Sequence, residues 1–202
     1  MGATLNEKLL EEKLAAIEKA RAWSPRVIAK LEALVTGGDD LAVFRVNPLA
    51  FGKEKGLAEA EAIDLFLHAA HGGLFQMDWQ LLCPGCGEAV ESFRSLQALH
   101  SEYYCTTCQM TAQASLDDYI QISFTVSPQI RPIRYHEPDT LSLEDYYFNY
   151  VFTRGSHYDG RDAIGIFKTL LCGLAALEPG EKKTIELTVA PGTLAIADHK
   201  TR

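Results

Sequence analysis

The chain has 202 residues, of which 47% are hydrophobic and 23% charged, with a formal net charge of −8. This composition excludes a disordered chain, and the acidic balance makes nucleic acid and anionic membranes unfavourable partners. No apolar run approaches the ~20 residues that cross a bilayer, and the polar N-terminus (residues 1–13) does not resemble a signal peptide. We therefore expect a cytoplasmic protein with no membrane segment in this chain.

Residues 1–38 are predicted to form a helical arm. Apolar residues recur at three- to five-residue spacing over residues 4–22, which indicates an amphipathic helix. Ser24-Pro25 is typical of a helix start, so a second helix is expected from there to about Val35, ending before Gly37-Gly38. We expect ordinary packing of this pair; the alternative is a dimer-forming coil.

Residues 39–82 are predicted to form a winged-helix-like unit. The expected order is a short strand at 41–44, a helix from Asn47-Pro48 to about residue 55, a helix over 58–71 and a strand over 74–82. A DNA-reading helix needs basic or amide side chains, but the second helix carries acidic ones at Glu59, Glu61 and Asp64. A packing or protein-interaction role is therefore favoured, with a nucleic-acid-binding adaptor as the alternative.

Two Cys-x-x-Cys motifs predict a zinc ribbon over residues 83–112. The ligands are expected to be Cys83, Cys86, Cys105 and Cys108, and 18 residues separate the two motifs. Pro84 and Gly85 suit the first turn, and Gly87 allows a positive φ. Four thiolates complete a tetrahedral shell, so we expect structural Zn²⁺; an iron–sulfur centre and a redox dithiol are the alternatives.

Residues 113–202 are predicted to form a small β-sandwich-like domain with a helical insertion. Strands are expected at 119–126, 184–189 and 193–197, and a helix, favoured over a strand, at 141–152. Residues 130–135 fit another short strand, but Pro132 favours an edge or a loop there. Residues 163–174 fit a helix or a strand equally well. Because a sandwich needs a further partner strand, we expect the chain to be a fragment of a longer protein. The overall fold class is thus predicted to be α+β.

No catalytic constellation is evident in the sequence, so we expect the chain itself not to be an enzyme. His68 and His71 lie three residues apart on one predicted helix, but without the glutamate of a zinc-hydrolase motif or an evident third ligand. His100 lies between the two cysteine motifs, whose four thiolates already suffice for one metal. Cys172 lies in an apolar run and is expected to be a buried thiol.

Several segments together resemble the N-terminal region of bacterial class III adenylate/guanylate cyclases. The resemblance covers about residues 20–200 and is carried by residues 45–50, 61–69, 73–75, 79, 83–87 and 124–128. It implies a regulatory or sensory module, without the metal-binding aspartates and the purine-selecting lysine of the catalytic domain. The implied partner is a cyclase catalytic domain in the same polypeptide, with a homodimer and an unidentified small ligand as further expectations.

The position of the cysteines in the sequence suggests a clamp. Residues 79–82 lead from the helical N-terminal half into Cys83, and Cys108 leads toward the β-rich C-terminal half. We therefore expect a bound zinc ion to fix how the two halves meet, and any signal to pass across that joint.

Overall fold

The computed structural model describes residues 4–95, 97, 99, 102–114, 119–153, 157–158, 160–189, 191–192 and 196. It contains helices and small sheets, which confirms the predicted α+β class. The chain divides into two compact units. Unit 1 comprises Met1–Gln80, Ser92–Leu99 and Gln121–Pro138, and unit 2 comprises Leu81–Glu91, His100–Ile120 and Asp139–Arg202. The winged-helix and sandwich details and the four predicted domain boundaries stay predictions.

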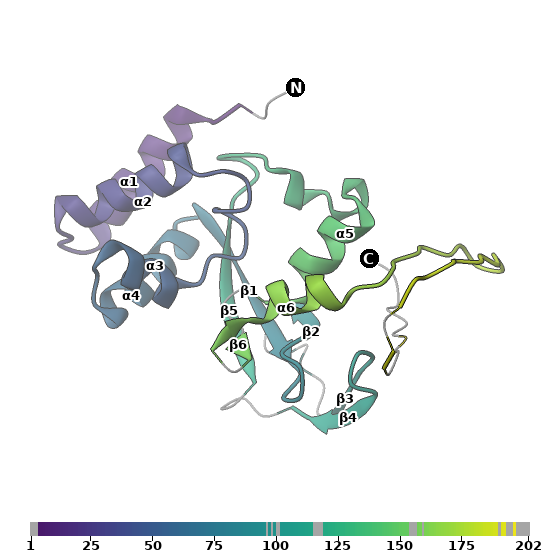
Figure 1. Ribbon diagram of the computed structural model, residues 1–202. Helices are drawn as coiled ribbons and strands as arrows, with labels where there is room; N and C mark the ends of the chain where they lie inside the picture. Colours follow the sequence, from purple (N-terminus) through teal and green to yellow (C-terminus); the bar gives the residue numbers. More distant parts are fainter. Residues whose placement is uncertain are drawn as a thin grey trace. The chain divides into compact units, whose positions relative to one another are not determined.

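Two helices at the start of unit 1 match the predicted arm. They are α1 (Glu7–Ala20) and α2 (Pro25–Gly37), drawn in purple and blue in Figure 1. The Asn6 side chain caps α1 by accepting a hydrogen bond from the Leu9 backbone N–H over 3.1 Å. The predicted amphipathic pattern is present in α1, where Leu10, Leu14 and Ile17 are buried.

The next two helices, α3 (Pro48–Lys55) and α4 (Glu59–His71), also lie where the sequence predicted them. Asn47 caps α3 by accepting hydrogen bonds from the backbone N–H groups of Leu49 and Ala50. A Cβ added at Gly52 would lie 2.8 Å from the Cβ of Ala62, so glycine is what allows α3 and α4 to approach so closely.

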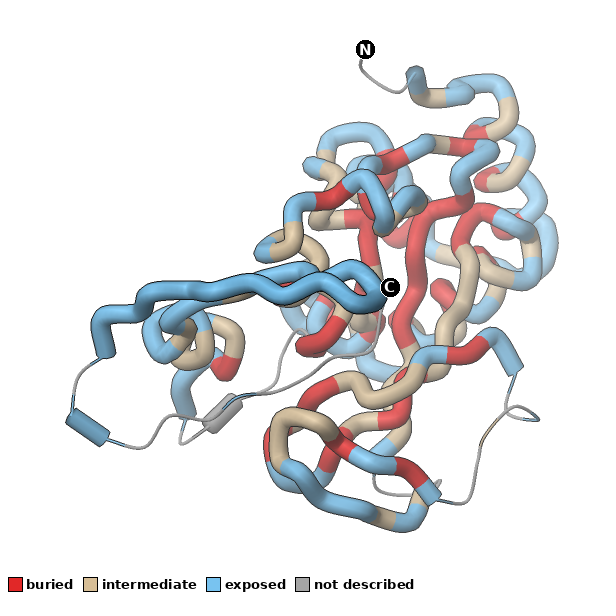
Figure 2. Tube along the Cα trace, turned by 90° about the vertical axis from the view of Figure 1, so that its right-hand side faces the viewer, coloured by how far each residue is buried: buried red, intermediate tan, exposed pale blue. Residues whose placement is uncertain are grey.

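A three-stranded sheet follows, with strand order β2-β1-β5. Its strands are β1 (Phe75–Leu82), β2 (Ala89–Phe93) and β5 (Ile120–Val126). Phe66 of α4 lies at the centre of the unit 1 core, with ring centroids 5.2 Å from Phe51, 5.3 Å from Phe75 and 5.2 Å from Phe124. Figure 2 shows this burial in red along the strands and the inner sides of the helices. Aromatic packing between helix and sheet therefore stabilises unit 1.

The short strand predicted at 41–44 is wrong, and the alternative of a loop holds for residues 130–135. Residues 41–44 form a turn, because Asp39 accepts hydrogen bonds from the Ala42 N–H at both its backbone oxygen (3.1 Å) and its side chain (2.7 Å). β-Pairing here is confined to one antiparallel bridge between Val46 and Phe124. Residues 130–135 do not form a strand either: a short 3₁₀ helix, Arg134–His136, occupies their end, beyond Pro132.

Unit 2 contains a hairpin and a helical segment. The hairpin pairs β3 (Glu102–Cys105) with β4 (Met110–Gln113) in antiparallel register. The predicted helix at 141–152 is present as α5 (Leu143–Tyr146) continued by a π-helical turn, η4 (Tyr147–Val151). The two-residue strands β6 (His157–Tyr158) and β7 (Arg161–Asp162) then lead into α6 (Ala163–Leu170), which resolves the ambiguity over 163–174 in favour of a helix up to Leu170.

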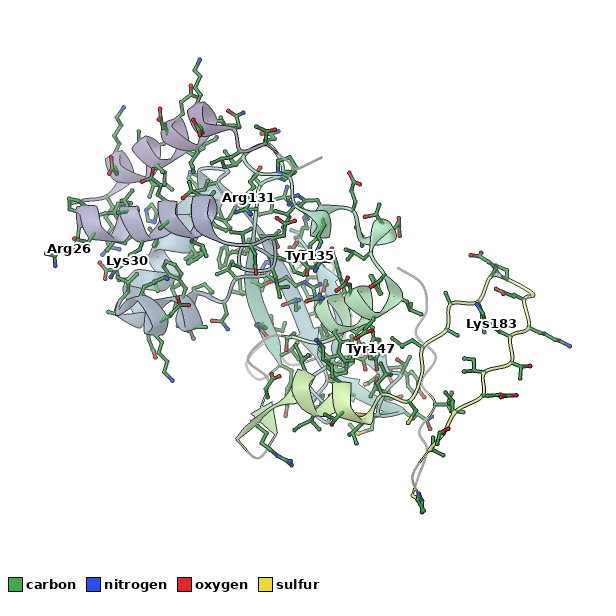
Figure 3. All side chains as sticks on the ribbon, turned by 45° about the horizontal axis from the view of Figure 1, so that its top comes forward. Arg26, Lys30, Arg131, Tyr135, Tyr147 and Lys183 are labelled. Carbon is green, nitrogen blue, oxygen red and sulfur yellow. The ribbon has the colours of Figure 1, made fainter. Side chains whose placement is uncertain are left out.

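The predicted strand at 184–189 is not formed among the described residues, and a turn at residues 178–181 precedes this segment. Glu181 N–H donates to the Glu178 carbonyl over 2.9 Å, and Gly180 has φ +84. The segment 171–189 is largely exposed, shown in blue in Figure 2, and Lys183 is labelled on it in Figure 3. Alternating residues form a strand only beside a pairing partner, which explains the miss. The last predicted strand, 193–197, lies outside the described residues, with the exception of Ile196.

Candidate metal centre

The first cysteine motif is shaped by hydrogen bonds within its own loop. The Cys83 N–H donates to the Glu88 carbonyl, and the Gly87 N–H donates to the Cys83 carbonyl, each over 2.8 Å. Gly87 has the predicted positive φ, +73. The Gly85 N–H points at the Cys83 Sγ over 3.4 Å, so the turn orients this sulfur inward.

The second motif forms the tip of the β3–β4 hairpin. Cys105 pairs with Met110 across the hairpin, and Gln109 takes a positive φ of +54 to close the turn. The Cys108 N–H donates to the Cys105 Sγ over 3.4 Å, which repeats the arrangement in the first motif. The Tyr103 hydroxyl donates to the Leu82 carbonyl over 3.3 Å and so ties the hairpin to the chain that enters the first motif.

The four sulfur atoms come together as the sequence predicted. All of them lie within 4.8 Å of one another, with Cys86 and Cys105 separated by 3.6 Å and Cys83 and Cys108 by 3.8 Å. With Zn–S bonds of about 2.3 Å, the sulfurs of a regular tetrahedron lie about 3.8 Å apart. Cys83, Cys86 and Cys105 are buried. The donor set and its spacing therefore fit a tetrahedral metal ion held by four thiolates.

A carboxylate that no sequence motif singles out lies against this cluster. Glu88 is only 4% exposed, and its Oε2 lies 3.2 Å from the Cys105 Sγ and 4.0 Å from the Cys86 Sγ. The backbone of Glu88 is fixed by its bond to Cys83 and by an antiparallel bridge to Phe152. The loop that positions two ligands thus also positions a buried acid beside them.

The environment shifts the pKa values of the thiols in different directions. Burial, together with the neighbouring Glu88, raises the pKa of Cys105 to about 12. Burial likewise raises the pKa of Cys86. At Cys83 burial is the largest influence and opposes ionisation, but the N–H donors of Cys86 and Gly85 and the thiols of Cys105 and Cys86 together lower the pKa of this thiol. An arriving cation must therefore displace protons from Cys86 and Cys105.

Aromatic side chains of unit 2 pack around the cluster. Phe167 of α6 packs against the buried cysteines and also against the core formed by Phe148, Val151 and Phe152. Tyr147, labelled in Figure 3, lies close enough for Glu88 to affect its titration: burial raises the pKa of Tyr147, the Glu88 charge adds to the rise, and a hydrogen bond with the Thr107 side chain opposes it. The candidate centre is thus part of the unit 2 core.

The remaining candidates from the sequence do not join this centre. The His68 ring bonds to the Asp64 carbonyl over 2.9 Å and meets the Trp23 ring edge-on, and neither His68 nor His71 belongs to the cysteine cluster. Cys172 is exposed, so its predicted burial is wrong; it lies just beyond the end of α6, where the chain leaves the core. His100 lies outside the described residues.

One protein family covers nearly the whole chain. The family of unknown function DUF5939 matches residues 10–202. The chain belongs to DUF5939. No curated protein and no solved structure matches it. The DUF5939 match includes all four cysteines, Glu88 and Phe167, so the candidate metal centre lies entirely within the family region.

Within the described part of the chain, no helix is both long enough and apolar enough to cross a membrane.

Proposed function

We propose that this chain is a non-catalytic, zinc-stabilised regulatory module of a bacterial nucleotide cyclase, working in the cytoplasm. It would act on a cyclase catalytic domain in the same polypeptide, through protein contacts or an unidentified small ligand. The regulatory role is supported by the sequence resemblance to the N-terminal region of class III adenylate/guanylate cyclases. The structural role of zinc is supported by the four-cysteine cluster.

The single observation that carries the proposal is the set of four close sulfur atoms, three of them buried. A tetrahedral ion held by four thiolates keeps no open position for a substrate or a water molecule. Zinc suits this set because it is redox-inert, accepts thiolates readily and has no preferred geometry of its own. A metal held in this way would stabilise the fold of unit 2 and leave the chemistry to another domain.

The proposed zinc site is tested by measuring which metal the purified chain binds and how many ions each chain holds. X-ray absorption at the zinc edge, together with elemental analysis of the purified chain, is expected to give one zinc ion per chain. Cys108→Ser should lower this occupancy. Cys172→Ser is the matched control, because it removes an exposed thiol outside the cluster and should leave one zinc ion per chain. Iron with a visible-absorption band would replace the zinc assignment with an iron–sulfur centre.

The regulatory role is tested in the longer protein that carries this region. Cyclase activity and oligomeric state are compared for the full-length protein and for a version lacking the residues that correspond to 1–202. Removal is expected to change the activity, the oligomeric state, or both, because class III cyclase sites form between two catalytic domains. If both stay the same, the regulatory proposal fails even when zinc is present.

A further inference from the structure

The buried acid beside the cysteine cluster calls for a physical explanation. Glu88 is 4% exposed, so its carboxylate lies inside the unit 2 core. Its Oε2 is 3.2 Å from the Cys105 Sγ and 4.0 Å from the Cys86 Sγ, so the acid faces two of the expected ligand atoms themselves.

The four sulfurs are not equivalent with respect to this acid. Cys86 and Cys105 form one edge of the tetrahedron, 3.6 Å long, and Glu88 contacts both of these atoms. Cys83 and Cys108 form the opposite edge, 3.8 Å long. Glu88 is therefore poised on the Cys86–Cys105 side, closest to Cys105.

We infer that Glu88 is a reserve ligand of the metal centre, able to take the coordination position of Cys105 when that sulfur is lost. The inference rests on the proposal that the four cysteines hold a metal ion. Carboxylate oxygen is an accepted zinc ligand in proteins, at about 2.0–2.2 Å. In the exchange the metal–Sγ bond of Cys105 would break and a bond to a Glu88 oxygen would form, while the released thiolate would take a proton from water and leave hydroxide in the solvent; the total charge of the metal's ligand set would be unchanged.

The backbone supports this role. The Glu88 carbonyl accepts from the Cys83 N–H over 2.8 Å, and Glu88 pairs with Phe152 in an antiparallel bridge. The main chain is thus held by the first cysteine motif and by the aromatic core together, and exchange requires only side-chain rotation. A site of this kind would retain its ion after loss of one thiolate.

The test uses the complete 202-residue chain with Co²⁺ as a spectroscopic substitute for zinc. The sulfur-to-cobalt charge-transfer band reports how many thiolates bind, and competition with a chelator gives Kd. Kd is compared for the unchanged chain, Cys105→Ser and Cys105→Ser/Glu88→Gln. The matched controls remove a sulfur of the opposite Cys83–Cys108 edge: Cys108→Ser and Cys108→Ser/Glu88→Gln. Circular dichroism checks that each variant is folded.

The expected result is an asymmetry between the two series. Cys105→Ser should bind Co²⁺ with three thiolates, and adding Glu88→Gln should raise Kd by more than the roughly 10–100-fold typical for losing an outer-shell partner of a metal site, because a ligand is removed. In the Cys108→Ser background the same change should raise Kd by no more than this outer-shell range, since Glu88 contacts the opposite edge.

The remaining outcomes overturn the inference in distinct ways. Equal effects of Glu88→Gln in the two backgrounds would make Glu88 a structural residue of the loop. A Cys105→Ser chain that neither binds Co²⁺ nor folds would also contradict it, because a reserve ligand should rescue this variant. Failure of the unchanged chain to bind Co²⁺ or Zn²⁺ would overturn the metal centre itself, before any substitution is considered.

Discussion

The ring of Phe167 lies 4.5 Å from the ring of Phe152, centroid to centroid, and the same Phe167 packs against the buried cysteines. One side chain of α6 therefore belongs both to the aromatic core of unit 2 and to the wall of the candidate metal centre. Glu88 makes a second connection, because it contacts the Cys105 sulfur and pairs with Phe152. Metal binding and the packing of the aromatic helices should therefore be energetically linked.

Truncation of Phe167 tests this link. Phe167→Ala is expected to lower the free energy of unfolding by about 2 kcal/mol, less than the 3–5 kcal/mol of a fully buried phenylalanine, because the side chain is only partly buried. It should also weaken metal binding. Leu170→Ala is the control, since Leu170 on the same helix is 65% exposed and should change neither quantity. Urea denaturation and chelator competition measure the two effects; no loss in either would separate α6 from the metal centre.

Metal removal should loosen unit 2 locally. We expect chelation, or Cys83→Ser, to expose the backbone amides of residues 83–88 and 102–113, because their turns are organised around the sulfurs. Hydrogen exchange followed by mass spectrometry measures this, with α1 and α2 as an internal reference that should keep its protection. A metal-free chain with unchanged exchange throughout would contradict the predicted clamp.

The turn of the first motif leaves little room for a methyl group. A Cβ added at Gly85 would lie 3.1 Å from the Cys108 Sγ, so Gly85→Ala is expected to weaken metal affinity by displacing that sulfur. The matched control is Gly37→Ala at the end of α2, where no atom lies within 4 Å of the added Cβ. This control should be neutral or slightly stabilising, by about 0.5 kcal/mol. Equal metal affinity of the Gly85→Ala chain and the unchanged chain would show that the sulfurs can adjust.

The stability of unit 1 should depend on pH through His136. Its Nδ1 lies 3.1 Å from the Ile133 N–H donor and its Nε2 lies 2.8 Å from the Val126 carbonyl, which is the pattern of a neutral ring. Burial lowers the pKa of His136 below its usual 6.5. The unfolded chain therefore binds the proton more readily, so the free energy of unfolding should fall as the pH drops below about 6.5 and level off below the folded-state pKa.

Substitution isolates this contribution. His136→Ala should lower the free energy of unfolding at pH 7.5 by roughly 1–3 kcal/mol, because two buried hydrogen bonds are lost, and should flatten the pH dependence. His71→Ala removes an exposed histidine of the same unit and is expected to leave the profile intact. Thermal unfolding from pH 5 to pH 8 distinguishes the two variants; an unchanged slope in His136→Ala would assign the dependence to other groups.

What the sequence determined about this protein is local. The cap at Asn47, the positive φ of Gly87 and the inward turn of each cysteine motif followed from patterns a few residues long. Each depends on hydrogen bonds within one turn, where neighbouring residues fix the backbone by themselves. The meeting of the two motifs followed from their spacing, which is typical of a zinc ribbon.

What only the tertiary structure decided involves residues far apart in the chain. Within the described part of the chain, residues 184–189 form no strand despite their alternation, and Cys172, although it lies in an apolar run, is exposed. From the sequence alone, Glu88 would be expected to be an exposed acidic residue. In the fold, its backbone pairs with Phe152 and its carboxylate lies against Cys105. Burial and strand pairing depend on which distant segments meet in the fold. A periodic pattern of apolar residues predicts a helix or strand but does not specify the segment that packs against it.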